Sequence, residues 1–495
     1  MSTLEAGDAP ALGLIGKLAH TFGATEAALR LLLSIFTGYG IAYVYRKVLI
    51  HQPNKLLHHL YFLVWGLLLC LFNFGRDTSH SLIAIATTYV LARFLRSSPR
   101  ELIIINFVFH MSYLLVGYYF TESNEYDILW TMPHCVLVLR LIGFSFDITD
   151  GLKKREQLSK EQQENAIASM PSVLELFAFA YFPCAFLIGP QFAYRRYQRF
   201  IEGEFMQFEG GNEAGLKRMS VGLAYLIVRQ VGASYFPDSY FISDEYAKVP
   251  FFWRLVYLGV WAKLSLCKYV ACWLLTEGAL MILGISYKGK KENGENDWSG
   301  CSNVNLFILE TGYSMQHYVH SFNVNTNQWV GQYVYKRLKF LNNRTISYAA
   351  ALGFLAVWHG FHSGYYMAFL NEYMTVTVEK QFASVWAKSK IDVYADIFSP
   401  PFVYPALKYC VQKLYDLFYI GWCMTPFILL SYPRWIKAYG SVNYFVFVAV
   451  IGWTIFYQAF KYFERTAKRR EQDNTFGRAT TLSPTVAETN DAKRD

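Results

Sequence analysis

Charge is scarce in this chain. Only 17% of its 495 residues are Asp, Glu, Lys or Arg, whereas 54% are hydrophobic and 18% are aromatic. A soluble protein of this length usually divides into several domains that carry more surface charge. The segments 60–75 and 102–121 contain no charged residue at all, and the second is long enough to cross a bilayer. The composition therefore indicates a polytopic membrane protein.

Other common features are also missing. The N-terminus is acidic and rich in small residues, so it lacks the basic segment of a signal peptide. The eight cysteines are scattered and show neither a paired framework nor a CxxC metal spacing. We find no internal repeat, and this absence disfavours a solute transporter, because many transporters consist of two similar halves.

Apolar segments are frequent along the rest of the chain. Further candidate spans are 27–44, 81–95, 173–192, 221–233, 251–285, 345–371, 404–430 and 442–460. The long segment 251–285 predicts more than one helix or one strongly tilted helix. By the usual length rule, the sequence predicts an all-α polytopic membrane protein with roughly ten or eleven transmembrane helices.

The net charge of +9 is concentrated between these segments. The basic clusters are 46–47, 153–155, 195–199, 336–339 and 468–470. The positive-inside rule explains them better than nucleic-acid binding does, and it places these loops in the cytosol. The same rule predicts that the sequon at Asn343 is unglycosylated, because it lies beside the cluster 336–339. We expect residues 463–495 to form a basic, disordered cytosolic tail.

His359 is the first candidate for chemistry. It lies in the segment 345–371, which contains no Asp, Glu, Lys or Arg, and an ionisable side chain at membrane depth is costly unless it faces a cavity. The alternative is a buried histidine that is bonded to a carbonyl group. Gly353, Ala356, Gly360 and Gly364 recur at helical spacing beside it, which predicts close approach by another helix or a ligand chain.

His362 forms a pair with His359, and two histidines at this spacing can begin a metal site. No third histidine or carboxylate lies nearby in sequence, so we expect no bound metal. A single imidazole fits general-base chemistry better.

A second candidate is the asparagine-rich segment 321–330. Asn323, Asn325 and Asn327 alternate in it, and asparagine side chains compete for backbone hydrogen bonds within a helix. The pattern predicts irregular or short extended structure, with a solvated loop as the simple alternative. The following segment, 333–340, is amphipathic and predicts a helix at the membrane surface.

The ordered motifs of this chain resemble those of the membrane-bound O-acyltransferase family. Asn323 is followed thirty-six residues later by His359 within Trp358-His359-Gly360, as in the catalytic pair of that family. Further segments similar to its lysophospholipid branch are 126–135, 139–151, 189–192, 268–278, and 322–329 together with 336–340. The resemblance extends from about Gly23 to Lys461.

The resemblance implies a family domain over residues 23–462, after an N-terminal segment 1–22, with its helices enclosing a catalytic chamber. It implies an enzyme that transfers an acyl group from long-chain acyl-CoA to the sn-2 hydroxyl of a lysophospholipid in phospholipid remodelling. Lysophosphatidylcholine is the expected acceptor, followed by lysophosphatidylserine or lysophosphatidylethanolamine. Acyl-CoA is a co-substrate, and we expect no permanently bound cofactor. The expected location is the membrane of the endoplasmic reticulum, although the C-terminal residues 491–495 lack a dilysine ending.

The resemblance assigns His359 as the general base. Asn323 is its catalytic partner, either as a donor to the developing oxyanion or as an orienting residue. Lys336, Arg337 and Lys339 are candidates for the phosphates of CoA, and ordinary membrane topology is the alternative for these three.

Some alternatives remain open at this stage. One alternative is an acyltransferase that acts on another lipid or on a protein, as in related branches of the family. Membrane lipids surround the chain in either case. A homo-oligomer is compatible with the sequence. The charged residues Lys263, Lys268 and Glu277 lie inside an apolar segment, so we expect them to face the protein interior as ion pairs or as cavity lining.

Overall fold

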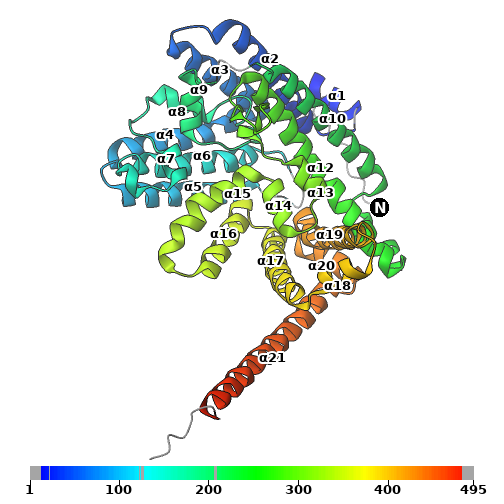
Figure 1. Ribbon diagram of the computed structural model, residues 1–495. Helices are drawn as coiled ribbons and strands as arrows, with labels where there is room; N and C mark the ends of the chain where they lie inside the picture. The colour runs from blue at the N-terminus through cyan, green and yellow to red at the C-terminus, as the bar shows by residue number, and fades with distance from the viewer. Residues whose placement is uncertain (1–12, 22, 122, 124–126, 206–208, 482–495) are drawn as a thin grey trace, which may run out of the picture.

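The computed structural model describes residues 13–21, 23–121, 123, 127–205 and 209–481. These residues fold mostly into helices (Figure 1). The strands found among them are Gly289–Lys290 (β1) and Asn296–Asp297 (β2), which form one short antiparallel ladder with Gly289 opposite Asp297. The predicted all-α class is confirmed.

Side-chain caps begin several of the N-terminal helices. These helices are α1 (Leu14–Thr21), α2 (Glu26–Val44), α3 (Lys55–Phe74), α4 (Thr78–Leu95), α5 (Pro99–Thr121) and α6 (Thr131–Asp150), with a π-helical turn η1 (Tyr45–Leu49) and a 3₁₀ turn η2 (Gly75–Asp77). Thr25 accepts a hydrogen bond from the amide of Ala28, and Asn54 accepts one from Leu56. Each bond satisfies a donor that an isolated helix leaves unpaired.

The middle of the chain contains α12, a 33-residue helix that is long and apolar enough to cross a membrane. The helices here are α7 (Lys160–Asn165), α8 (Val173–Ala180), α9 (Tyr194–Ile201), α10 (Gly211–Tyr235), α11 (Asp244–Lys248) and α12 (Phe251–Leu283), with 3₁₀ turns η3 (Arg155–Gln157) and η4 (Tyr240–Ile242). A capping box of Ser159 and Gln162 begins α7. The segment 251–285 folds as the single 33-residue helix α12, which is the one-helix alternative of the two that the sequence left open.

The C-terminal part adds nine helices within the described residues. They are α13 (Leu306–Thr311), α14 (Met315–Ser321), α15 (Val324–Val330), α16 (Arg344–His359), α17 (Ser363–Ser389), α18 (Ile391–Phe398), α19 (Val403–Leu429), α20 (Tyr432–Ser441) and α21 (Phe445–Thr481). The turns are η5 (Ser299–Cys301), the π-helical η6 (Gly331–Tyr335) and the 3₁₀ η7 (Lys336–Leu341). The segment predicted as one amphipathic surface helix is therefore divided between η6 and η7.

Helix α12 is the element around which the two halves of the chain meet. It packs along α10 and also contacts α19 and α2. Thr276, Glu277 and Gly278, near the C-terminal end of α12, are buried. Polar groups on this end are thereby brought into the protein interior, where they need internal partners.

Six segments of the described chain are long and apolar enough to cross a membrane. They are Glu26–Leu49, Lys55–Leu95, Pro99–Thr121, Thr131–Asp150, Phe251–Leu283 and Phe445–Gln472. The 41-residue segment among them contains both α3 and α4, joined by η2. A polytopic membrane protein is confirmed, while the count of ten or eleven spans remains a prediction.

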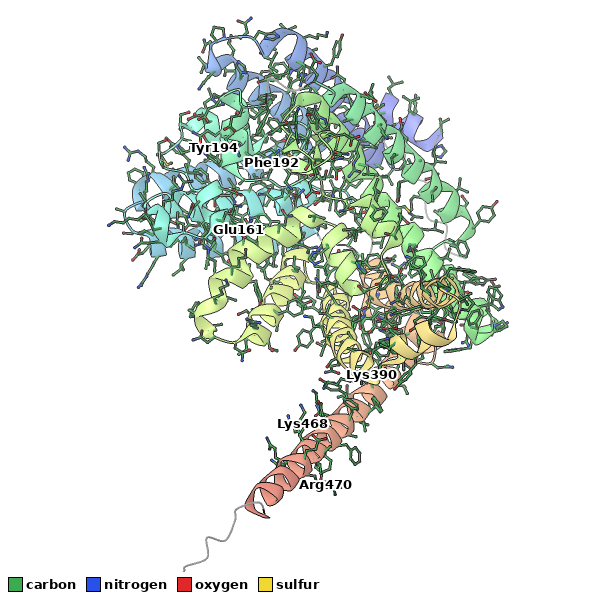
Figure 2. The ribbon with its side chains drawn as sticks, viewed as in Figure 1. Glu161, Phe192, Tyr194, Lys390, Lys468 and Arg470 are labelled. Carbon is green, nitrogen blue, oxygen red and sulfur yellow. The ribbon has the colours of Figure 1, made fainter. Side chains whose placement is uncertain are left out.

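The structure differs from the sequence-based expectation at the C-terminus. Helix α21 leaves the body of the protein (Figure 1) and continues to Thr481, so residues 463–481 are helical rather than disordered. The carboxylate of Glu464 on this helix bonds Lys388 of α17 at 2.5 Å and Lys461 at 3.2 Å. Lys468 and Arg470 project from its outer part (Figure 2). Residues 482–495 lie outside the described chain.

Candidate functional site

Asn323 begins and His359 ends a helical hairpin, in which α16 returns along α15 and η6 (Figure 1). The rings of Trp329 and Phe354 stack between the two arms, with their centroids 5.5 Å apart. Asn323 precedes Trp329 by six residues, and His359 follows Phe354 by five, which corresponds to a rise of about 9 Å and 8 Å. Both residues therefore lie at the same end of the hairpin.

A series of aromatic contacts connects the two positions. Phe322, next to Asn323, has its ring centroid 6.4 Å from that of Tyr269 on α12. Tyr269 lies 6.2 Å from Phe427 on α19, and Phe427 lies 5.3 Å from the ring of His359. The candidate site therefore forms where α12, α15, α16 and α19 meet.

Helix α16 ends at His359 because of the residue that follows. Gly360 has φ of 120°, a conformation that costs glycine little and other residues much. The chain then turns into α17, where Gly364 packs so closely on α19 that an added Cβ atom would lie 2.0 Å from the carbonyl oxygen of Pro426. Close approach is thus confirmed at Gly364. At Gly353 nothing lies within 4 Å of such an atom, and the break at Gly360 prevents the four small residues from sharing one helical face.

The imidazole of His359 is surrounded by aromatic rings. Its centroid lies 5.1 Å from Tyr365, 5.6 Å from Phe369 and 5.3 Å from Phe427. Among the hydrogen bonds between described residues, none involves its ring nitrogens. The alternative of a histidine bonded to a protein carbonyl is therefore not what the described structure contains.

The backbone at His359 is held by its neighbour Trp358. The indole Nε1 of Trp358 donates to the carbonyl oxygen of Cys135 on α6 at 2.9 Å. The hydroxyl of Tyr118 on α5 donates to the carbonyl oxygen of Trp358 at 3.2 Å. These bonds fix the end of α16 against two other helices, and the sequence reasoning did not foresee them.

The three asparagines have different roles. The Nδ2 amides of Asn325 and Asn327 donate to backbone carbonyls, Asn325 to Ser302 at 3.3 Å and Asn327 to Val319 at 2.9 Å. Both residues lie inside α15, so the prediction of irregular structure is wrong there, because these long-range bonds remove the competition with the helix. Asn323 precedes the helix in a left-handed conformation, with φ of 50°.

The side chain of Asn323 is oriented through its oxygen. Asn303 Nδ2 donates to Asn323 Oδ1 at 3.2 Å, which leaves the Nδ2 hydrogens of Asn323 available to another acceptor. The other groups of Asn303 are also bonded. Its carbonyl oxygen accepts from the amide of Val324 at 2.9 Å, and its Oδ1 accepts from the amide of Asn325 at 3.0 Å.

A buried carboxylate supports this arrangement. Glu277 of α12 is fully buried, and its Oε1 accepts from the amides of Asn303 at 2.6 Å and Val304 at 3.1 Å. Its Oε2 accepts from Arg218 Nε at 2.7 Å. The structure thus makes Glu277 an ion-paired structural group. In the sequence, Glu277 was noticeable as a carboxylate within an apolar segment. Its partner Arg218 could not be identified there, because the two residues are 59 positions apart.

The basic stretch lies at the turn of the hairpin, away from Asn323 and His359. The ammonium of Lys336 contacts Glu161 at 2.6 Å (Glu161 is labelled in Figure 2), and the hydrogen bond from Lys336 lowers the pKa of Glu161 to about 2. Arg337 forms an ion pair with Asp150 at the end of α6, while Lys339 is exposed. Two of the three predicted CoA-binding charges therefore already have carboxylate partners.

No metal centre accompanies the histidine pair within the part of the chain that the structure describes. No group of three or more His, Cys, Asp or Glu side chains is placed there to hold a metal ion. The ring of His362 instead contacts Tyr365, with centroids 5.8 Å apart.

Comparisons with known proteins agree with this architecture. A model of the membrane-bound O-acyltransferase family matches residues 115–404, which include both Asn323 and His359. The Drosophila melanogaster protein named lysophospholipid acyltransferase 5 is 56% identical over 463 residues, covering 94% of this chain and 93% of the relative. Proteins of the same name from Homo sapiens and Caenorhabditis elegans are 40% and 32% identical, covering 87% and 88% of this chain and 88% and 92% of the relatives. This chain therefore belongs to the membrane-bound O-acyltransferase family.

Proposed function

We propose that the protein is an acyl-CoA-dependent lysophospholipid acyltransferase that esterifies the sn-2 hydroxyl of lysophospholipids. Lysophosphatidylcholine is the preferred acceptor, with lysophosphatidylserine and lysophosphatidylethanolamine as further acceptors. The names of the relatives support this proposal. The observation that carries it is the position of an imidazole and an amide donor at one end of the hairpin, where the atoms concerned make no hydrogen bond to another described residue.

The chemistry requires no covalent enzyme intermediate. In the proposed step, His359 accepts the proton of the sn-2 hydroxyl while the oxygen attacks the thioester carbonyl of acyl-CoA. The Nδ2 amide of Asn323 donates to the oxyanion that develops on that carbonyl. The intermediate collapses with release of the CoA thiolate, which takes up the proton held by His359. The products are a diacyl phospholipid and CoA.

The aromatic surroundings of His359 suit this role. Tyr365, Phe369 and Phe427 restrict water around the imidazole, and exclusion of water limits hydrolysis of the thioester. The same low-dielectric environment strengthens the interaction of Asn323 with a developing charge.

We place the catalytic domain at residues 23–462 and the protein in the membrane of the endoplasmic reticulum. For the phosphates of CoA, Lys339 is the best of the three basic candidates, because Lys336 and Arg337 are paired with carboxylates. Binding of CoA by the other two requires exchange of those partners.

The proposed reaction is tested with purified protein and a panel of lysolipids and acyl-CoAs. We expect acyl-CoA-dependent conversion of lysophosphatidylcholine, with slower conversion of the serine and ethanolamine lysolipids and none of diacylglycerol or a sterol. The readout is the acylated product by mass spectrometry together with free CoA. Acylation of a sterol or diacylglycerol in preference to every lysolipid would contradict the proposed acceptor class.

The contacts of Asn303 predict a positioning role in this reaction. We expect Asn303→Ala to lower kcat by about tenfold to a hundredfold with little change in KM, because it releases the oxygen of Asn323 and misplaces its amide. Ser302→Ala is the matched control, because its side chain takes no part in the hydrogen bonds to Asn323. The double variant Asn303→Ala/Asn323→Ala should have the same kcat as Asn323→Ala alone. Additive losses would show that Asn303 acts independently of Asn323.

A further inference from the structure

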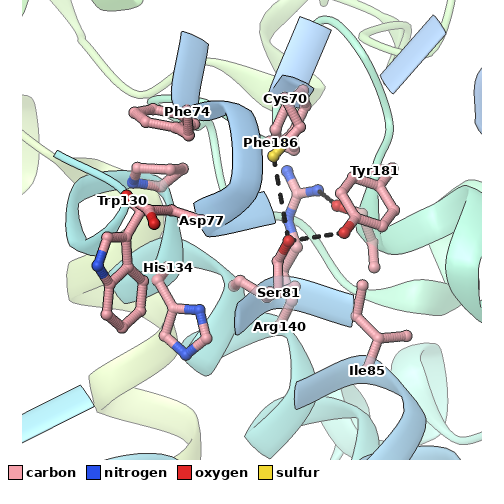
Figure 3. A pocket seen from close by; sticks show the side chains of 13 residues that line it. Cys70, Phe74, Asp77, Ser81, Ile85, Trp130, His134, Arg140, Tyr181 and Phe186 are labelled. Atoms are coloured by element: carbon pink, nitrogen blue, oxygen red, sulfur yellow. Dashed lines mark hydrogen bonds between the residues drawn. The ribbon is translucent and has the colours of Figure 1, made fainter. Parts of the chain in front are cut away.

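Two further groups of polar side chains lie outside the residues described above. The first lines the cavity between α3, α4 and α6, where Ser81 bonds Tyr181 at 2.6 Å and Arg140 donates to carbonyl oxygens of the protein itself (Figure 3). The second lies where α14, α17 and α19 meet, around the carboxylate of Glu379. The first group is bonded within the N-terminal half of the chain, whereas the second adjoins the segment that leads to Asn323.

Glu379 belongs to α17, but it bonds the beginning of α14. Its Oε1 and Oε2 accept from the backbone amide of Met315 at 2.9 Å and 3.2 Å. Met315 is the first residue of α14, and the amides in the first turn of a helix have no partner within that helix. A side chain 64 residues further along the chain therefore satisfies one of these amides and ties the two helices together.

Helix α14 connects this bond to Asn323. The helix has seven residues, a length of about 10 Å, and it ends at Ser321, two residues before Asn323. Asn327 Nδ2 donates to the carbonyl oxygen of Phe322 at 3.0 Å, so the segment after the helix is bonded as well. Because both ends of this short segment are held, a shift of Met315 also displaces Asn323.

Helix α17 connects the same carboxylate to His359. The rings of Tyr365 and Phe369, in the first two turns of α17, lie 5.1 Å and 5.6 Å from the ring of His359. Glu379 follows Phe369 by ten residues, which corresponds to a rise of about 15 Å along the helix. The bond to Glu379 thus links Asn323 and His359 through α14 and α17, in addition to the link through the hairpin of α15 and α16.

Two neighbouring bonds show how α14 and Glu379 are held. Tyr318 of α14 donates through its hydroxyl to Asp416 Oδ2 on α19 at 3.5 Å, a longer bond than the one from Met315 to Glu379. The hydroxyl of Tyr415, also on α19, donates to Glu379 Oε1 at 3.2 Å. The bond from Tyr415 orients the carboxylate without contacting α14, so the contributions of the two bonds to Glu379 can be separated by substitution.

We propose that Glu379 is a positioning residue for acyl transfer, because it fixes α14 on α17 and so sets the place of Asn323 relative to His359. This inference rests on the proposed function for the reaction in which Asn323 and His359 act together. Glu379 acts on Asn323 and not on a substrate, so its replacement should lower kcat and leave the KM values for both substrates nearly unchanged.

The test compares variants in steady-state assays with acyl-CoA and lysophosphatidylcholine, with turnover normalised to folded protein. We expect Glu379→Ala to lower kcat by about tenfold to a hundredfold. Glu379→Gln should retain kcat within about threefold of the wild-type value, because its amide oxygen still accepts from Met315. Tyr415→Phe is the matched control, because it removes a bond to the same carboxylate and leaves the bond to α14 in place. Its kcat should also stay within about threefold of the wild-type value.

Two further measurements separate positioning from a loss of stability. The double variant Glu379→Ala/Asn323→Ala should have the same kcat as Asn323→Ala alone, because Glu379 acts through Asn323. Hydrogen exchange followed by mass spectrometry should be faster in peptide 313–323 of Glu379→Ala and unchanged in peptide 344–359. If Glu379→Ala does not fold, Glu379→Asp takes its place in every comparison, because the shorter side chain withdraws the acceptor from Met315.

Wild-type kcat in the folded variant, equal losses in the alanine and glutamine variants, or multiplied losses in the double variant would overturn the positioning role. Unchanged exchange in peptide 313–323 would overturn the link between Glu379 and α14. If the wild-type protein acylates no lysolipid, the proposed function fails, and the exchange rates of that peptide alone decide whether Glu379 holds α14. Full activity of the wild-type protein together with full activity of Glu379→Ala would leave the proposed function standing and remove Glu379 from it.

Discussion

In His359→Ala we expect acyl transfer to fall by about a hundredfold to ten-thousandfold, the usual contribution of a general base. The sn-2 hydroxyl is a poor nucleophile at neutral pH, and the imidazole of His359 lies in the aromatic environment formed by Tyr365, Phe369 and Phe427. The loss should appear in kcat, measured as formation of free CoA and diacyl phospholipid by protein that elutes as a folded species.

His362→Ala is the matched control for this experiment. His362 lies three residues further along and contacts the same Tyr365, but it begins α17 rather than ending α16. Its replacement should leave kcat within a few-fold of the wild-type value. Wild-type turnover by folded His359→Ala, or equal losses in the two variants, would rule out His359 as the base.

For Asn323→Ala the expected loss of kcat is about a hundredfold or more. Removing one donor to an oxyanion in a water-poor site costs about 3 to 4 kcal/mol of transition-state stabilisation. The side-chain oxygen of Asn323 accepts from Asn303, so the variant also leaves that donor unpaired, at a cost of about 1 to 3 kcal/mol in stability. Turnover must therefore be normalised to folded protein, with thermal unfolding measured in parallel.

Asn325→Ala and Asn327→Ala are the internal controls. Their amides bond backbone carbonyls of the preceding segment, so we expect lower unfolding temperatures with kcat changed by only a few-fold in the folded fraction. If all three variants lose activity equally and mildly, Asn323 has no special role in the chemistry and His359 lacks its proposed partner.

The sequence alone determined the class of the protein. In lipid, a long uncharged segment forms its backbone hydrogen bonds most readily as a helix, because no water is present to bond the N–H and C=O groups. For this reason the all-α membrane fold could be predicted. The cap of α7 at Ser159 was also predictable, because a capping box depends on residues three apart. The ordered motifs around Asn323 and His359 indicated the family, which the comparisons show.

Only the tertiary structure decided what each polar residue does. Asn325 and Asn327 could be distinguished from Asn323 only by their bonds to residues 302 and 319. Likewise, Lys336 and Arg337 carry the charge expected of phosphate-binding residues, yet Glu161 and Asp150 lie against them from segments more than a hundred residues away. The partners of a buried polar group are set by packing between distant helices, and periodicity along one helix does not contain that information.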